Sequence, residues 1–329
     1  TKIEEKMGMH SSFTCEVVYE NSVAHLVGEE GQGIEYMFHL MNESRIGVGL
    51  QAISGLEACL SYVRQYAETR VQFGKTLLEL PLYAYNLKNW EIERDAFRCL
   101  MVDTYGQFDI YAKIDLMQRH GKVLSKDEAA LFSKAKKICR LRTPLVKYYG
   151  AETYTTLSQK CIQALGGYGF IAEYEAERFH RDSFAPLLYE GTSQIQALMA
   201  LKDLFKFISK SPMTYIKLAF TPTFYLKMTN SNENFKHLML LKNFRKNLLK
   251  LVFKTVYSSK PKSMKSLFND EVIEKLMVYA ETICQALSYL ETAKVVLNMS
   301  KVDKKKLELF HDYHKLVLPR FPAIYQERK

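Results

Sequence analysis

The chain of 329 residues lacks the features of several protein classes. No segment holds the roughly 18 or more uninterrupted apolar residues that a membrane span needs, and the N-terminus has no charged and then apolar signal region. The six cysteines are scattered without a CxxC pair, which argues against a disulfide framework or a zinc site. The eight histidines are also dispersed, so no metal site is predicted. We expect a globular protein of a cytoplasmic or matrix-like compartment.

Positive charge is present but unevenly distributed. The net charge is +10, and residues 211–329 hold 21 Lys and Arg against 10 Asp and Glu, so this region carries the whole excess. It begins where Ser211-Pro212 breaks a helical pattern, which we interpret as a domain boundary. With 47% hydrophobic residues, the length suffices for two or three domains. The predicted division is 1–33, 34–210 and 211–329.

Helical periodicity dominates from residue 34 onward. Long helices joined by short turns pack as antiparallel bundles. The predicted helices are 34–70, 80–120, 126–165 and 191–209, followed in the last region by 232–258, 264–299 and 304–316. The sequence therefore predicts a mainly α fold, with a four-helix bundle and a basic helical extension.

The first 27 residues contain strand-like runs, such as the alternating segment from Phe13 to Tyr19. An isolated hairpin is marginal in water, so this piece should need partner strands that precede Thr1. The chain also begins without methionine, and we expect it to be the C-terminal part of a longer protein. The glycine-rich segment Gly28–Gly33 is interpreted as a plain turn, because neither a Lys-Ser/Thr pair nor a parallel βαβ unit accompanies it.

The run from Leu188 to Gln196 is the most informative stretch of the chain. It sets Glu190 beside Gly191 at the start of a predicted helix, and a loop is expected between Gly169 and Glu190. A carboxylate held in such a place can act as a base. Charged residues make up 25% of the chain, so composition alone favours an ordinary solvated surface glutamate at this point.

Four separated segments agree in order and spacing with one pattern. They are Gly28–Gly33 with Asn42–Gly47, Arg70–Lys75, Gln163–Phe170, and Arg181–Asp182 with Tyr189–Gln196. Together they resemble the acyl-CoA dehydrogenase family, and the resemblance covers about residues 1–210. One such motif is weak evidence, whereas four in register are specific. The opening segment Lys6–Ser12 and the basic extension resemble the larger members of the family.

The resemblance implies a fold and a reaction. The family has an N-terminal helical domain, a middle β-domain and a C-terminal four-helix domain, of which this chain would hold the end of the second and all of the third. The implied reaction is the FAD-dependent oxidation of an acyl-CoA thioester to the trans-2-enoyl-CoA, with a hydride passing from Cβ to flavin N5. Glu190 matches the base that removes the α-proton. A minority of relatives place the base directly before the arginine that matches Arg45; Ser44 stands there, which favours Glu190, although Glu43 keeps the question open.

The resemblance also implies the residues that hold the cofactor and the substrate. Two groups match contacts to the flavin dinucleotide of a neighbouring protomer, and a third matches contacts to the flavin across the active site. These groups are Arg70 with Phe73, Gln163 with Gly166 and Gly167, and Thr192 with Gln194. The positions that match the substrate side are Asn42, Arg45, Tyr189 and Gly191. Asn42 departs from the family, because some relatives carry an aspartate there that contacts CoA.

A cofactor bound across a subunit boundary implies a homodimer or homotetramer built on the four-helix domain. Electron-transfer flavoprotein is the electron acceptor that the family implies. An alternative is a family member that has lost dehydrogenation and binds nucleic acid through residues 211–329. The same extension could dock on an anionic membrane surface, since residues 213–228 have the apolar and aromatic content of an amphipathic helix. That stretch could equally form a contact between domains.

Overall fold

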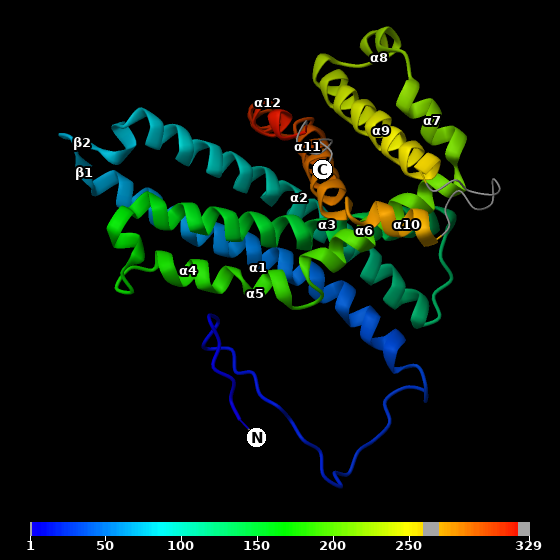
Figure 1. Ribbon diagram of the computed structural model, residues 1–329. Helices are drawn as coiled ribbons and strands as arrows, with labels where there is room; N and C mark the ends of the chain where they lie inside the picture. Colours follow the sequence, from blue (N-terminus) through cyan, green and yellow to red (C-terminus); the bar gives the residue numbers. More distant parts are fainter. Residues whose placement is uncertain (1, 259–269, 322–329) are drawn as a thin grey trace. The chain divides into compact units, whose positions relative to one another are not determined.

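A computed structural model describes residues 2–258 and 270–321, which are almost entirely helical after the first 32 residues (Figure 1). The chain forms two compact units. Unit 1 comprises Thr1–Arg94 and Gly150–Thr192, and unit 2 comprises Asp95–Tyr149 and Ser193–Lys329. The prediction of a mainly α fold is confirmed. The three-part domain division remains a prediction.

Unit 1 is built on three long helices, of which it takes the whole of the first and parts of the other two. These are α1 (Gly33–Thr69), α2 (Pro81–Arg119) and α3 (Lys126–Leu165). Their predicted ends were correct within one or two residues. The smaller elements of this unit are β1 (Val71–Gln72), β2 (Lys75–Thr76), η1 (Leu77–Glu79), η2 (Gly166–Phe170), α4 (Ala176–Ser183) and α5 (Ala185–Leu188).

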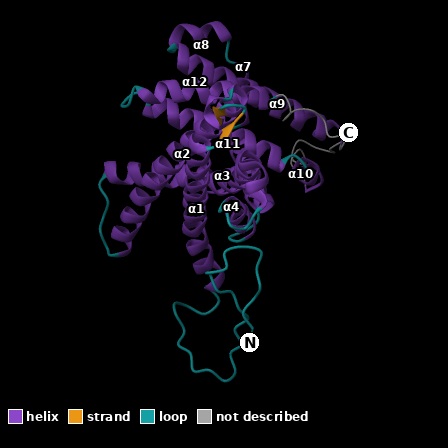
Figure 2. Cartoon of the chain, turned by 90° about the vertical axis from the view of Figure 1, so that its left-hand side faces the viewer, coloured by secondary structure: helices purple, strands orange, loops and turns teal. Residues whose placement is uncertain are grey.

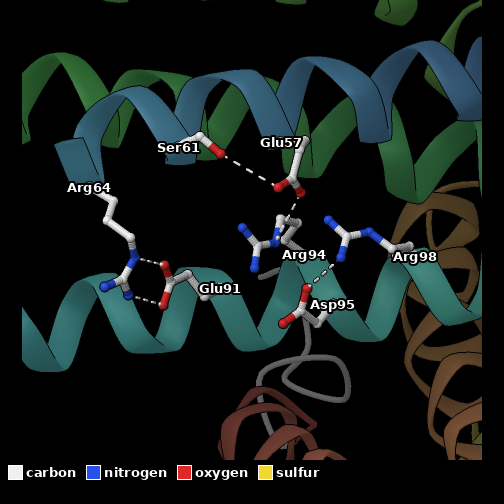
Figure 3. A network of polar contacts seen from close by, with 7 residues as sticks. All are labelled: Glu57, Ser61, Arg64, Glu91, Arg94, Asp95 and Arg98. Carbon is white, nitrogen blue, oxygen red and sulfur yellow. Dashed lines mark hydrogen bonds and ion pairs between the residues drawn. The ribbon is translucent and has the colours of Figure 1, made fainter.

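Ion pairs between α1 and α2 show that these helices run antiparallel (Figure 3). The Arg64 guanidinium donates two hydrogen bonds to the Glu91 carboxylate, at 2.7 Å from Nε to Oε1 and 2.6 Å from Nη2 to Oε2. About two turns earlier on α1, Glu57 forms an ion pair with Arg94 at 3.4 Å. These side chains are partly exposed, so each pair contributes about 1 kcal/mol or less.

The core of unit 1 forms where α1, α2 and α3 meet. One buried cluster of this core consists of Cys59, Leu60, Val63, Leu87, Cys161, Leu165 and Ala176. The Tyr66 hydroxyl donates to the carbonyl of Leu165 at 3.4 Å, which fixes the end of α3 against α1. The core therefore holds rigid the two helix ends from which the cofactor-matching motifs project.

Residues 2–32 are loop rather than strand (Figure 2). Within residues 2–32 the only strand-type pairing is the bridge between Ile3 and Cys15, so the strand expected from Phe13 to Tyr19 does not form. A strand needs a hydrogen-bonded neighbour along its length, and this part of the chain supplies only that bridge. The segment is nevertheless anchored, because the Met9 amide donates to Asp182 Oδ1 at 2.6 Å.

The loop expected between Gly169 and Glu190 was a wrong prediction. The segment contains the short helices α4 and α5. In α4 the Arg181 guanidinium binds Glu177 one turn earlier, at 2.9 Å from Nη2 to Oε1, a local pairing that stabilises short helices. The same arginine reaches the Met7 carbonyl at 2.9 Å, so α4 also anchors the N-terminal segment.

Unit 2 adds seven α-helices to its parts of α2 and α3, among the residues that the structure describes. They are α6 (Ser193–Lys210), α7 (Pro212–Phe220), α8 (Thr223–Thr229), α9 (Asn232–Ser258), α10 (Asp270–Met277), α11 (Ala280–Met299) and α12 (Lys305–Val317), which the turn η4 (Leu318–Arg320) follows. Helix α11 is the central element, since it packs against α6, α9 and α12. The Tyr149 hydroxyl of α3 lies 3.0 Å from that of Tyr313 in α12.

Two helix predictions in the extension need correction. The amphipathic stretch 213–228 is two helices, because Thr221-Pro222 separates α7 from α8 and proline lacks the amide that would continue the first. The helix predicted over 264–299 is interrupted between Met277 and Ala280, which divides it into α10 and α11. The predicted start of that helix at Met264 lies outside the described residues.

Among the described residues, α1 is the one helix long and apolar enough to cross a membrane by length and composition. Half of its most apolar window is buried inside the structure. A core helix passes the same test, so this finding is weak evidence for a span.

A buried histidine in unit 2 gives a pH-dependent stability. His237 of α9 is 5% exposed, and burial lowers its pKa to about 4, which the negative charge of Glu291 opposes and the positive charge of Lys294 supports. Because the unfolded chain binds this proton near pH 6.5, stability is full above that pH and is lost as the pH falls toward 4. The loss is about 2–3 kcal/mol.

We expect His237→Leu to flatten the fall in unfolding free energy between pH 6.5 and pH 4, measured by urea unfolding at several pH values. His120→Leu, at the exposed end of α2, should leave that slope unchanged. Equal slopes in wild type and His237→Leu would contradict the assignment.

Candidate functional site

The turn that joins α5 to α6 holds Glu190 in an unusual backbone conformation. Glu190 has φ = +58° and Gly191 has φ = +88°. Glycine adopts this region freely, whereas a residue with a side chain is strained there by about 1–3 kcal/mol. Such strain persists only where the surrounding structure enforces it, and it is concentrated at functional sites.

Arg45 of α1 stabilises this turn by a hydrogen bond to its backbone. Its Nε donates to the Glu190 carbonyl at 3.1 Å, and its Nη1 donates to Asn42 Oδ1 at 3.2 Å. Arg45 is only 3% exposed, and burial lowers the pKa of its guanidinium while the Glu190 carboxylate acts in the opposite direction. The Oε2 atom of Glu190 is itself buried. One oxygen of a partly buried carboxylate is thus shielded from water near a buried cation, which suits a proton acceptor.

Gln51 completes the turn, and the sequence did not single it out. The Tyr189 hydroxyl donates to Gln51 Oε1, so α1 also holds the residue before Glu190. The signal available in the sequence was a lone amide among apolar and small residues from Ile46 to Leu56. Glu43, the other carboxylate considered, has an exposed side chain.

A second cluster lies at the far end of α1. A cavity of about 500 Å³ opens between the end of α1, the start of α2 and the end of α3. Its lining includes Gln163 and Gly166 among the predicted residues, together with Tyr66, Tyr83, Trp90 and Lys160. Gly167 is exposed next to it. The structure therefore brings the end of α3 to a hollow of mixed aromatic and polar character.

Arg70 stands at the end of α1, near this cavity, with unused hydrogen-bonding capacity. Its guanidinium lies 5.3 Å from the ring centre of Tyr168, and its Nε is buried without a hydrogen-bond partner in the described structure. A buried donor left unbonded is costly, so this N–H is available to a hydrogen-bond acceptor. Guanidinium groups bind phosphate oxygens strongly.

The hairpin after Arg70 presents an aromatic ring to solvent. Strands β1 and β2 are joined by Phe73 and Gly74, both with positive φ, as a two-residue hairpin turn requires. Gly74 suits this turn, whereas Phe73 does not, and Phe73 is 91% exposed. A strained and exposed phenylalanine is suited to contact a second molecule.

The site residues predicted from the sequence do not all lie close together in one protomer. Arg45 and Arg70 are 25 positions apart on α1 and its end, or about 38 Å at the rise of an α-helix. One protomer therefore cannot bring both side chains to the same small chemical group. Thr192 is exposed in the Glu190 turn, and Gln194 is exposed in the first turn of α6, which belongs to unit 2.

Comparisons with known proteins agree with these motifs. The model of the acyl-CoA dehydrogenase C-terminal domain matches residues 31–205. Acryloyl-CoA reductase (NADH) of Anaerotignum propionicum is 29% identical over 208 residues, which are 62% of this chain and 46% of that protein. The mitochondrial short/branched chain specific acyl-CoA dehydrogenase of Rattus norvegicus is 29% identical over 196 residues, covering 59% and 40%. The chain thus spans somewhat less than half the length of these relatives.

Two solved structures share the fold over nearly the whole chain. An acyl-CoA dehydrogenase from Bacillus anthracis complexed with FAD gives a TM-score of 0.76 at 22% identity, over 99% of this chain and 55% of that one. ACDH-11 of Caenorhabditis elegans gives a TM-score of 0.67 at 19% identity, over 96% and 49%. At these identities the likeness concerns the fold alone. It includes the helices that follow residue 205.

Proposed function

The chain belongs to the acyl-CoA dehydrogenase family, and we propose that the protein oxidises an acyl-CoA thioester between Cα and Cβ with Glu190 as the base. One observation carries this proposal. The Glu190 carboxylate has a buried oxygen and a left-handed backbone that buried Arg45 holds in place. Ordinary surface glutamates show none of these features.

Glu190 would take the proton from Cα of the thioester. That proton is weakly acidic, so the site must stabilise the charge that develops on the thioester oxygen. The backbone N–H of Glu190 is the donor that the family resemblance assigns to this oxygen. The same carboxylate can return the proton in the reverse direction, and the names of the relatives include a reductase as well as a dehydrogenase. Acyl chain length and direction are left to experiment.

FAD is the cofactor that this chemistry requires, and the residues present fit it. When bound, it accepts the hydride from Cβ. Arg70 offers a buried, unbonded N–H for a phosphate, and the cavity beside Gln163 and Gly166 can take an aromatic or polar part of the dinucleotide. Phe73 and Gly167 would add contacts to the same neighbouring cofactor, and Thr192 and Gln194 would contact the flavin of their own site.

The separation between Arg45 and Arg70 supports a homo-oligomer. If Arg70 binds the cofactor of a neighbouring protomer, the roughly 38 Å along α1 poses no difficulty. A dimer or tetramer with the cofactor shared between subunits satisfies both clusters. Electron-transfer flavoprotein remains the proposed electron acceptor.

Replacing Arg70 should weaken FAD retention. A charged hydrogen bond to phosphate contributes about 1.5–3 kcal/mol, so Arg70→Ala should raise the dissociation constant for FAD by about 10-fold to 100-fold. Flavin content after gel filtration and fluorescence titration of the full-length apoprotein would measure it. Arg64→Ala is the matched control, because Glu91 already satisfies that guanidinium. Equal retention in both variants would contradict the phosphate role.

One surface of the extension favours an anionic partner. Helices α7 and α8 expose Met213, Phe220, Phe224, Tyr225 and Met228, each more than half accessible. Exposed lysines border them, including Lys217 and Lys227, and Lys246 lies 5.3 Å from the ring centre of Phe220. Apolar rings with flanking lysines suit the interface of an anionic membrane better than a nucleic acid groove, for which arginines are few.

We expect the full-length protein to bind phosphatidylglycerol vesicles and not phosphatidylcholine vesicles. Phe224→Ser with Tyr225→Ser should weaken that binding by about 10-fold or more, since each buried ring contributes about 1.5–3 kcal/mol. Val302→Ser, an isolated exposed apolar residue, is the control. Binding to single-stranded DNA alone would favour the nucleic acid alternative.

A further inference from the structure

Gln51 links the residue before the proposed base to the N-terminal segment. Its Oε1 accepts a hydrogen bond from the Tyr189 hydroxyl. Its Nε2 donates to the sulfur of Met9 at 3.7 Å, a distance suited to a weak N–H···S bond. Both ends of the amide are therefore used, and each end has the polarity that its partner needs.

A backbone hydrogen bond fixes the position of Met9. Its amide donates to Asp182 of α4 at 2.6 Å, and its backbone has φ = +53°. Arg181, the neighbour of Asp182, holds the Met7 carbonyl at 2.9 Å. Gln51 lies on α1, and Met9 connects its side chain to α4.

Hydrogen bonds hold the Glu190 turn on both sides of its strained residue. Arg45 holds the carbonyl of Glu190, which follows its Cα, at 3.1 Å. Gln51 holds the side chain of Tyr189, which precedes it. Two anchors on opposite sides limit the rotation of the backbone around Glu190, and so they limit where its carboxylate points. A turn with φ = +58° at a glutamate would otherwise relax.

The hydroxyl of Tyr189 remains a donor at neutral pH. Burial raises the pKa of Tyr189, and the hydrogen bond to Gln51 only partly opposes that shift. The hydrogen bond from Tyr189 to Gln51 therefore persists at neutral pH.

We propose that Gln51 is a positioning residue, which aims the Glu190 carboxylate by holding Tyr189. The proposal rests on the dehydrogenase function for its catalytic consequence but not for its structural one. It assigns no contact between Gln51 and the substrate.

The catalytic test uses the full-length enzyme with its preferred acyl-CoA. Gln51→Leu removes the acceptor, and a small misplacement of the base should lower kcat by about 10-fold to 100-fold with KM little changed. Tyr189→Phe removes the donor and should give a similar loss. The double variant should be no worse than either, because both changes break one bond. Gln51→Glu keeps an acceptor and should recover most of the activity.

Ser54→Ala on the same helix is the matched control. Ser54 is exposed and bonds only to the Leu50 carbonyl at 2.9 Å, so activity should be unchanged. Losses that add in the double variant, or a Gln51→Leu enzyme with wild-type kcat, would overturn the proposal.

A measurement that does not depend on catalytic turnover tests the positioning role of Gln51 separately from the proposed dehydrogenase function. Amide hydrogen exchange of the peptide that covers residues 189–196 should be faster in Gln51→Leu than in wild type and in Ser54→Ala. Exchange that is unchanged in Gln51→Leu would overturn the positioning role even if the enzyme is active. Faster exchange in a protein that reacts with no acyl-CoA would leave the positioning intact and refute the dehydrogenase function.

Discussion

Glu190→Gln should lower kcat for acyl-CoA oxidation by about 10²-fold to 10⁴-fold or more, the range expected for loss of a general base. The amide keeps the size of the side chain and can remain in the turn that Arg45 holds through the Glu190 carbonyl. It cannot accept the α-proton. Substrate affinity and flavin content should therefore change much less than kcat, as rapid-mixing kinetics and equilibrium titration of the full-length protein would show.

Glu43→Gln is the discriminating companion to this variant. Glu43 lies on α1 two residues before Arg45, and its side chain is exposed. If Glu190 is the base, Glu43→Gln keeps nearly full activity. A large loss in Glu43→Gln together with an active Glu190→Gln would move the base to α1 and refute the present assignment.

Arg142→Met should destabilise the protein by about 3 kcal/mol, the second large effect that we expect. Arg142 of α3 is 5% exposed in its side chain and binds Asp103 of α2 and, at 3.2 Å, Glu291 of α11. The variant leaves Glu291, which is 14% exposed, with the ion pair that it forms with Lys294 at 3.2 Å. Asp103 can regain water because it is 36% exposed, which keeps the loss at the lower end of the range for a broken buried pair.

Arg140→Met, two residues earlier on α3, is the matched control for that loss. Arg140 is 61% exposed and binds the Asp203 carboxylate through both Nε and Nη2, with 2.6 Å from Nη2 to Oδ1. An exposed pair contributes about 1 kcal/mol or less despite its good geometry. Urea unfolding followed by helical circular dichroism would compare the two midpoints. Equal midpoints would show that burial does not decide the contribution of these arginines.

The long helices could be predicted closely because their ends carry clear signals. The predicted helix 126–165 coincides with α3, and Pro81 and Gly121 mark the limits of α2 within two residues. Proline and glycine act locally, so a single sequence displays their effect. The mainly helical fold follows from the same periodicity.

Features that depend on distant partners could not be predicted. The strand expected near Phe13 needs neighbours that the described chain supplies only at Cys15. Helices α4 and α5 are short, and α4 is fixed in part by Arg181 contacting Met7, 174 positions away. Likewise, no spacing rule joins Gln51 to Tyr189 across 138 positions.

The candidate site shows the same division between local and distant information. The motif around Glu190 was visible in the sequence, and the roles of the site residues remain predictions. The left-handed backbone of Glu190 and the unbonded Nε of Arg70 are properties of the folded chain alone. They are the observations that turn a motif match into a testable arrangement.

The most direct measurement is the visible absorption of the purified full-length protein during anaerobic addition of acyl-CoA thioesters of increasing chain length. We predict that bound flavin loses its visible band with at least one thioester, and that Glu190→Gln slows this loss by about 10²-fold to 10⁴-fold. A flavin that stays oxidised with every thioester, or one that is reduced at the wild-type rate in Glu190→Gln, would contradict the central claim.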